Sequence, residues 1–246
     1  MPPLAPGSGP QHISGEVGAR GETGAFFDRV RGMNIGAFRL GGFPARALVL
    51  WLAAAGAAAT AVALISSPVR AEQAAVDVVR QYQAALIAAM QQGAAYEARY
   101  RSLLGPVTKA FDLGFVAQRA AGPAWSSFSA AQQKRYVDVF ARYSVAQHAA
   151  RFKSFGGERF EVLGSDDVGR GYVRVRTQIV TRSERVQLDY LLGQRAGGWR
   201  IVDVFAKGAI SEVATRRADF APVIQAQGAD GLIRELEAKV AQAKAP

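Results

Sequence analysis

Apolar and polar residues alternate with a period of two in three consecutive stretches, Gly171–Thr181, Arg185–Leu192 and Trp199–Lys207. A polar turn separates the first two stretches, and the Gly-rich segment Gly193–Gly198 separates the second from the third. Alternation of β-branched and aromatic residues between such turns is typical of half-buried antiparallel strands. A sheet with one apolar face must bury that face against another layer. The chain is therefore expected to contain helices that cover these strands.

Apolar residues at helical spacing predict such helices on both sides of the strands. Before the strands, the predicted helices are Gln73–Met90, Tyr96–Leu104 with a stop at Gly105-Pro106, Val107–Phe115 with its continuation to Gly122, and the long Ala130–Phe155. After the strands, they are Ile210–Arg217, Asp219–Gln227 and Ala229–Lys244. Ser129 and Gln132 have the spacing of a capping box at the start of the long helix.

A shorter strand is predicted at Arg159–Leu163, followed by a turn at Gly164–Gly171. Gly208 is expected to permit a sharp exit from the last strand, and Ser211 is expected to cap the next helix. These elements predict an α+β fold, in which helices pack on a twisted antiparallel sheet of about four strands. A closed core and an apolar cavity have the same sequence signature, so the pattern leaves both open.

The N-terminal part differs in composition from the rest. Residues 1–45 are rich in Gly, Pro and Ser and predict a disordered extension, within which Met33 is an alternative start. Residues 46–71 contain the apolar run Ala47–Ile65 and end in Val69-Arg70-Ala71. This segment predicts a secretory signal peptide or, if it is not cleaved, a membrane anchor. Both place the single predicted domain, residues 72–246, outside the cytoplasm.

Composition excludes several kinds of site. The chain has no Cys and two His, His12 and His148, so disulfides, thiolate sites and multi-His metal sites are excluded. From Glu72 onward there are 24 Lys and Arg against 17 Asp and Glu, which gives +7 of the chain's net charge of +10. These cations are dispersed and match no nucleic-acid-binding motif. They fit an ordinary well-charged soluble surface or a basic surface that meets an anionic partner or a membrane face.

Several short motifs occur in a characteristic order. They are Phe111-Asp112-Leu113 with Ala117 before Gly122–Trp125, Gln133–Tyr136 with Phe140, Leu188-Asp189-Tyr190, Gly198–Val204, Gly208–Ser211 and Arg217–Phe220. With this set the chain resembles the MlaC/Ttg2D family of periplasmic phospholipid-binding proteins, over roughly Ala75 to Leu236. Within that family it is most similar to the HpnM branch, which is associated with hopanoid biosynthesis.

The resemblance implies a fold with an NTF2-like sheet, whose helices enclose an apolar cavity for acyl chains. It implies a periplasmic carrier that moves lipid between an outer-membrane lipoprotein complex and an inner-membrane ABC-transporter complex. We expect no cofactor and, from the dispersed charges, no nucleic-acid partner. The lipid would be a phospholipid or a hopanoid-type lipid.

Ten apolar or aromatic residues are candidates for the lining of such a cavity, although each fits a closed core equally well. The candidates are Phe111, Phe115, Phe140, Tyr143, Val175, Ile179, Leu188, Tyr190, Val202 and Val204. Two other functions stay open, a lipid-free adaptor at the membrane and a small NTF2-like isomerase or dehydratase. An enzyme of that kind needs a carboxylate and a phenol in one pocket. Neighbours such as Asp189 and Tyr190 face opposite ways on a strand, and Asp203 would need a favourable register to join Tyr190.

Overall fold

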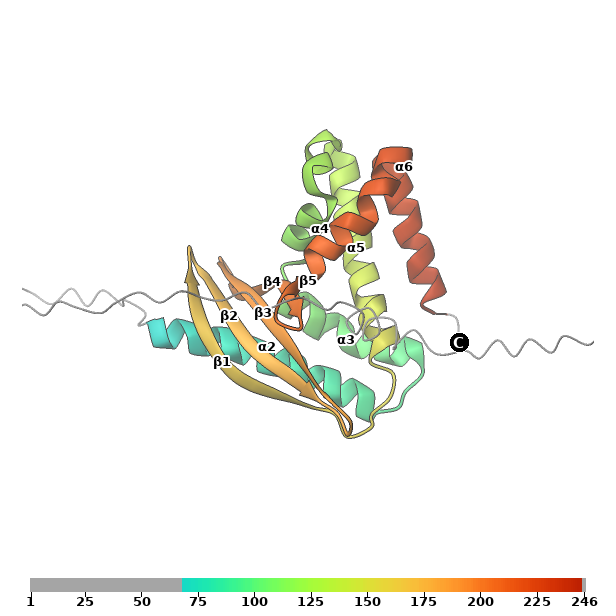
Figure 1. Ribbon diagram of the computed structural model, residues 1–246. Helices are drawn as coiled ribbons and strands as arrows, with labels where there is room; N and C mark the ends of the chain where they lie inside the picture. The colour runs from blue at the N-terminus through green and yellow to red at the C-terminus, as the bar shows by residue number, and fades with distance from the viewer. Residues whose placement is uncertain (1–67, 245–246) are drawn as a thin grey trace, which may run out of the picture. The chain divides into compact units, whose positions relative to one another are not determined.

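The computed structural model describes residues 68–244, so residues 1–45, the run Ala47–Ile65 and the proposed start at Met33 lie outside it. Within the described part, helices pack on and beside an antiparallel sheet (Figure 1). None of these helices is both long and apolar enough to cross a membrane. The helices are α2 (Pro68–Gln91), α3 (Tyr96–Ala110), α4 (Leu113–Ala121), the 3₁₀ helix η1 (Gly122–Ser127), α5 (Ala130–Arg151) and α6 (Glu212–Gln242).

The sheet has five strands in the order β1-β2-β3-β4-β5, and every neighbouring pair is antiparallel. This confirms the α+β fold with an antiparallel sheet and helices. The strands are β1 (Arg159–Gly169), β2 (Tyr172–Val180), β3 (Arg185–Arg195), β4 (Gly198–Ala206) and the two-residue β5 (Ile210–Ser211).

One face of the sheet, called the inner face here, is covered by α2, which runs along it (Figure 1). Cross-strand partners share a face, and Val175, Tyr190 and Val204 are aligned across β2, β3 and β4. Tyr82 of α2 meets this row, since its ring centroid lies 6.0 Å from that of Tyr190. The alternation that predicted the strands therefore reflects burial of the inner face beneath α2.

The two edges of the sheet differ. Beyond β4, one end of the edge is covered by β5 and the other end by the α3–α4 connection. In that connection, Phe111 forms a β-bridge with Ile201, and the Asp112 amide donates a hydrogen bond to the Ile201 carbonyl at 3.0 Å. At the opposite edge, β1 has no further strand beside it among residues 68–244. Its register with β2 is interrupted twice, between Val162 and Gly164 and between Asp167 and Gly169.

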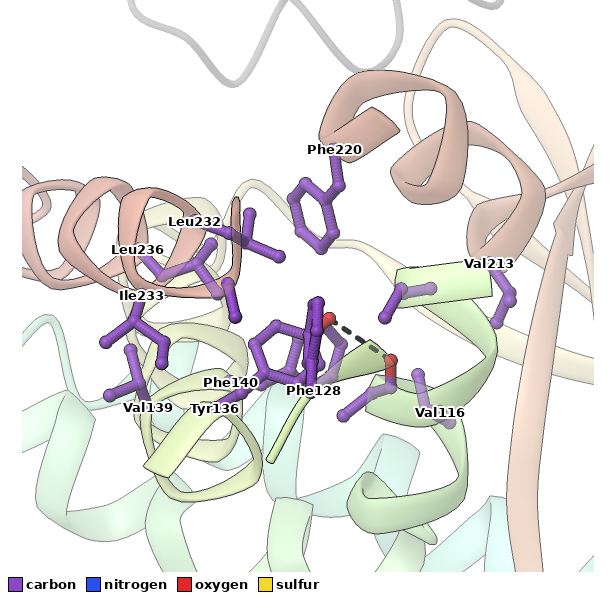
Figure 2. Packing of buried hydrophobic residues seen from close by; sticks show 14 residues of the cluster. Val116, Phe128, Tyr136, Val139, Phe140, Val213, Phe220, Leu232, Ile233 and Leu236 are labelled. Carbon is purple, nitrogen blue, oxygen red and sulfur yellow. Dashed lines mark hydrogen bonds between the residues drawn. The ribbon is translucent and has the colours of Figure 1, made fainter. Parts of the chain in front are cut away.

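A second group of buried residues lies away from the sheet, between α4, α5 and α6 (Figure 2). This helical cluster is centred on Tyr136 and Phe140, neither of which is exposed. The Tyr136 hydroxyl donates a hydrogen bond to the Ala117 carbonyl at 3.1 Å, so its polar group is satisfied in the apolar surroundings. The largest other members are Val116, Phe128, Val139, Val213, Phe220, Leu232, Ile233 and Leu236.

Helix α6 is joined to β4 by a compact capping arrangement. Gly208 has a φ of 69° in the turn after β4, a conformation that glycine adopts at little cost. Ser211 accepts a hydrogen bond from the Ala214 amide and donates to Asp203, whose other carboxylate oxygen accepts from the Val213 amide. The helix start predicted at Ser211 is thus found, and so is the capping box of Ser129 and Gln132.

Some predicted helix boundaries were wrong. Helix α3 continues through Gly105-Pro106 to Ala110, because Leu103, Val107 and Ala110 bury one continuous face. Pro106 cannot donate to the carbonyl one turn earlier. Since Pro106 keeps exposed surface, water can satisfy that carbonyl. The predicted helix Val107–Phe115 is in fact divided at Phe111-Asp112, where the chain pairs with β4.

Three further boundaries also differ from the prediction. Helix α5 ends at Arg151, before Phe155. The three predicted C-terminal helices form α6, which is interrupted only at Gly228 with a φ of 65°, while Ile210 belongs to β5. The residues after Leu163 extend β1 to Gly169 instead of forming a turn, because irregular pairing there accommodates Gly164 within the strand.

Candidate functional site

A groove of about 550 Å³ lies between α2 and the inner face of β1. This volume is within the range of small-molecule sites. Residues from α2, from the α5–β1 loop and from β1 line it. They are Arg80, Gln83, Ala84, Ile87, Ala88, Gln91, Phe155, Glu158, Arg159, Phe160 and Val162.

The groove exists because α2 covers β1 less completely than it covers β2. Phe160 and Val162 pair with Ile179 and Thr177 on the same face of the sheet. The two β2 residues are buried, whereas Phe160 and Val162 keep part of their surface exposed. The apolar surface of the sheet is therefore left unfilled at its free edge.

The α2 wall of the groove is built from one helix face. Ile87 and Ala88 lie three and four residues after Ala84, and Gln91 lies four and three residues after them, which brings all four to the same side of the helix. The two alanines are exposed, and their small side chains leave room beside Ile87. Larger residues at these two positions would occupy the space between α2 and β1.

Gln83 closes the inner end of the groove with a buried polar contact. Its amide donates to the Thr177 hydroxyl at 3.2 Å, and that hydroxyl donates to the Leu188 carbonyl at 2.6 Å. Gln83, Thr177 and Tyr190 are all almost completely buried. Burial raises the pKa of Tyr190 to about 12, so this phenol stays neutral.

Behind Gln83, an aromatic and polar cluster joins α2 to α5. The Nδ1 atom of His148 lies 2.6 Å from the Ser144 carbonyl, which can only accept. Nδ1 therefore carries the proton, and Nε2 accepts from the Tyr82 hydroxyl at 2.7 Å. Burial lowers the pKa of His148 to about 4, although its hydrogen bond to Ser144 acts in the opposite direction. The cluster is thus neutral near pH 7.

Charged side chains flank the groove at its solvent side. Arg80 from α2 and Arg159 from β1 belong to its lining, and more than half of each side chain is exposed. Arg159 pairs with Glu161 at 2.9 Å, and Arg80 approaches Asp77 at 3.8 Å. Exposed pairs of this kind contribute little to stability, so both guanidinium groups can reorient toward a bound anion.

None of the ten sequence-predicted lining residues borders this groove. Val175, Ile179, Leu188 and Tyr190 are buried on the inner face beneath α2, with Val204 half-buried beside Tyr190.

The other predicted residues lie elsewhere in the fold. Val202 is buried where the register of β3 and β4 shifts. Phe111 packs edge-on against Tyr82, at 5.2 Å between ring centroids. Phe115 lies under the guanidinium of Arg195.

Phe140 and Tyr143 lie in or against the helical cluster. The structure therefore divides the ten residues between the covered sheet, the α3–α4 connection and the helical cluster. Their role in lipid binding stays a prediction.

Sequence reasoning missed the α2 and β1 walls of the groove. The available signals were two alanines beside Ile87 and the Phe160–Val162 alternation, but both also fit an ordinary surface helix and an edge strand. Whether these residues line a groove depends on which strand lies at the edge of the sheet, and the strand order is a property of the topology.

The groove provides apolar walls and charged side chains, which are groups suited to binding a ligand. Within residues 68–244, no group of three or more His, Asp or Glu side chains is placed to hold a metal ion. Asp203 is aligned with Leu191, which neighbours Tyr190 on β3, so the carboxylate and the phenol face opposite sides of the sheet. The Asp203 carboxylate is also engaged at the start of α6.

Comparison with known proteins gives a family for this arrangement. The fold is similar to that of a phospholipid-binding protein from Ralstonia solanacearum, whose structure was solved in complex with a phospholipid. The similarity has a TM-score of 0.61 at 21% sequence identity and covers 71% of this chain and 99% of that one. A search of curated proteins gave no significant match. The family model described as MlaC protein matches residues 80–238, and the chain therefore belongs to the MlaC family.

Proposed function

We propose that this protein is a periplasmic lipid carrier that holds acyl chains in the groove between α2 and β1. The observation that carries the proposal is the groove itself, an apolar concavity on the inner face of the sheet with charged groups at its solvent side. Membership of the MlaC family supports it. The Ralstonia protein of similar fold binds a phospholipid, which makes this lipid class the first to test.

The groove can bind lipid through its apolar surface alone. Burying a methylene group is worth about 0.8 kcal/mol, so roughly five or more methylenes must be buried between Ile87 and Phe160 to offset an association cost of at least about 4 kcal/mol. The head group would stay at the solvent side, near Arg80 and Arg159. A guanidinium pairs well with a phosphate, which favours a phospholipid over a lipid without an anionic group.

The HpnM-like and hopanoid assignment is a finer proposal. A hopanoid-type lipid would use the apolar walls without needing the two arginines. Replacing both Arg80 and Arg159 by Gln is therefore expected to weaken phospholipid binding and to spare a neutral hopanoid-type lipid.

We further propose that lipid is exchanged by docking to an inner-membrane ABC-transporter complex and an outer-membrane lipoprotein complex, as the family resemblance implies. Uptake would involve movement of α2 relative to β1, since these two elements form the walls. Export would depend on residues 46–71, acting as a signal peptide or as an uncleaved anchor of the inner membrane. An enzymatic role is not proposed, because the family is one of lipid-binding carriers and Asp203 and Tyr190 do not share a pocket.

Native mass spectrometry of the protein as the cell processes it, followed by lipid extraction, tests the carrier function. A bound lipid at near-stoichiometric amount supports it and identifies the cargo. Ile87→Asp, which places a charge in the groove, should remove that lipid, whereas Leu104→Asp on the exposed surface of α3 should retain it. A lipid-free mass that does not change after incubation with membranes would instead favour the lipid-free adaptor.

A further inference from the structure

The loop between α5 and β1, residues 152–158, presents a single aromatic side chain to solvent at the groove. Phe155 is 42% exposed and is the only exposed aromatic residue in the described part of the chain. It also belongs to the groove lining. Phe152, at the base of the same loop, is stacked on His148 at 6.1 Å between ring centroids. The loop is thus anchored at its base and apolar at its tip.

The tip carries no charged side chain. Ser154, Gly156 and Gly157 surround Phe155 and are all exposed, and Gly157 has a φ of 94°. A segment of this kind can enter an apolar medium without the high cost of removing a charge from water. Phe155, Ser154 and the two glycines therefore form a wedge that can be inserted next to the opening of the groove.

The charges around the tip favour an anionic surface. Lys153 is exposed and has no ion pair among residues 68–244. Of the nearby carboxylates, Glu161 pairs with Arg159, and Glu158 is turned toward the loop backbone, where it accepts from the Gly156 amide at 2.6 Å. A lysine beside an apolar wedge can direct its ammonium group to phosphates while its methylenes stay in the apolar layer.

We propose that this loop is a membrane-contact surface, in which Phe155 enters the interface of an anionic lipid bilayer and Lys153 pairs with lipid phosphates. The contact would place the open side of the groove at the depth of the acyl chains of the bilayer. This role of the contact rests on the proposed carrier function. The physical basis is that of interfacial anchors, in which apolar insertion and electrostatic attraction act together.

A site-specific probe tests the contact in the protein as the cell processes it. Because the chain has no Cys, Ser154→Cys gives a single position for an environment-sensitive fluorophore and keeps Phe155 in place. Val168→Cys, at a 50% exposed position far along β1, is the matched control. Adding vesicles of phosphatidylcholine and phosphatidylglycerol should shift the emission to shorter wavelength at 154 and not at 168. Equal shifts at both positions, or no shift at 154, would overturn the proposal.

Two further changes separate the apolar and electrostatic parts. Phe155→Ser in the 154-labelled chain should raise the vesicle concentration needed for half the shift about ten-fold, as expected for loss of one inserted aromatic ring. Lys153→Gln should raise it about five-fold, and only when phosphatidylglycerol is present. Lys109→Gln on α3 should have no effect. A shift that Phe155→Ser leaves unchanged, or that requires a partner protein complex instead of vesicles, would overturn the membrane contact.

Lipid delivered from detergent separates this proposal from the carrier function. A chain that shows the shift at 154 but takes up no delivered lipid keeps the membrane contact and loses the carrier function. A chain that takes up lipid and shows no shift keeps the carrier function and loses the membrane contact.

Discussion

The helical cluster and the groove bury the same kinds of side chains but differ in how completely they are covered. In the helical cluster, Phe140 is enclosed by residues of α4, α5 and α6 and has no exposed surface. In the groove, Phe160 and Val162 face α2 across an unfilled space and stay half-buried. The first region has the packing of a core, whereas the second is only partly filled by side chains.

The difference comes from the position of each region in the fold. Helices α4, α5 and α6 close the cluster from several directions (Figure 2). The groove lies at the free edge of the sheet, where α2 is the only helix of the described part of the chain that packs against β1 to a substantial extent. Whether an apolar side chain is accessible to a ligand therefore depends on whether its strand lies at the edge of the sheet. The type of the residue does not determine this accessibility.

The largest expected effect is the loss of stability when the helical cluster is hollowed. Phe140→Ala should lower the free energy of unfolding by about 3–5 kcal/mol, because it leaves a cavity among packed rings. Urea denaturation measures this cost. The amount of lipid bound per folded molecule should stay at the wild-type level. A variant that keeps its stability and loses lipid would assign Phe140 to the binding site and break the comparison.

The next effect is a pH dependence at the junction of the two regions, where His148 of α5 meets Tyr82 of α2. The pKa of His148 is about 4 in the fold, against 6.5 as its ordinary value, so the unfolded chain binds the proton more tightly. The stability from this residue is complete above pH 6.5 and is lost as the pH falls toward 4, by up to about 3 kcal/mol.

Urea denaturation across that pH range measures the loss, with His148→Gln as the control because glutamine does not titrate. The wild type should lose more stability than this variant between pH 6.5 and pH 4. Parallel curves for the two proteins would show that the buried histidine does not titrate as the structure requires.

A smaller effect is expected from filling the groove. Ala84→Trp should lower lipid affinity about ten-fold, or ~1.4 kcal/mol, because the indole occupies the space between α2 and β1. Ala218→Trp, at an exposed alanine of α6, makes the same exchange outside the groove and should bind lipid normally. Titration with a fluorescent phospholipid distinguishes them. Equal affinities would place the lipid elsewhere, for example among the residues predicted from the sequence.

The smallest effect concerns the link between the helical cluster and the sheet. Ser211→Ala removes the hydroxyl that accepts from Ala214 and donates to Asp203, at an expected cost of about 1 kcal/mol. Thermal unfolding measures this cost, and Ser129→Ala at the start of α5 is a matched loss of another cap. Lipid affinity should not change in either variant. A loss of lipid in Ser211→Ala alone would mean that the position of α6 controls the groove.

Much of the fold could be predicted from the sequence, because the strands and helix starts depend on local pattern. The alternation in β2, β3 and β4 and the caps at Ser129 and Ser211 all appear in the structure. The continuation of α3 past Pro106 could not be predicted, because it depends on tertiary burial of Val107 and Ala110. Local stop signals are overridden where packing on the next turn outweighs one lost hydrogen bond.

The site was less predictable than the fold. The strongest apolar alternation marks the middle strands β2 and β3, such as Val175 and Tyr190, and these are the positions that α2 covers completely. The groove depends on Phe160 and Val162 in a short strand pattern, together with two alanines that also fit an ordinary surface helix. These residues form a groove only because of the strand order and the placement of α2.

The free edge of the sheet also bears on the risk of aggregation through strand pairing. An uncovered strand can recruit strands from other molecules and lead to aggregation. The other edge is closed by β5 and by Phe111, which leaves β1 as the exposed one. Its two register shifts and its charged residues, among them Glu161, Asp166 and Asp167, make it a poor template for regular strand addition. We therefore expect the irregular strand beside the groove to disfavour polymerisation through the sheet.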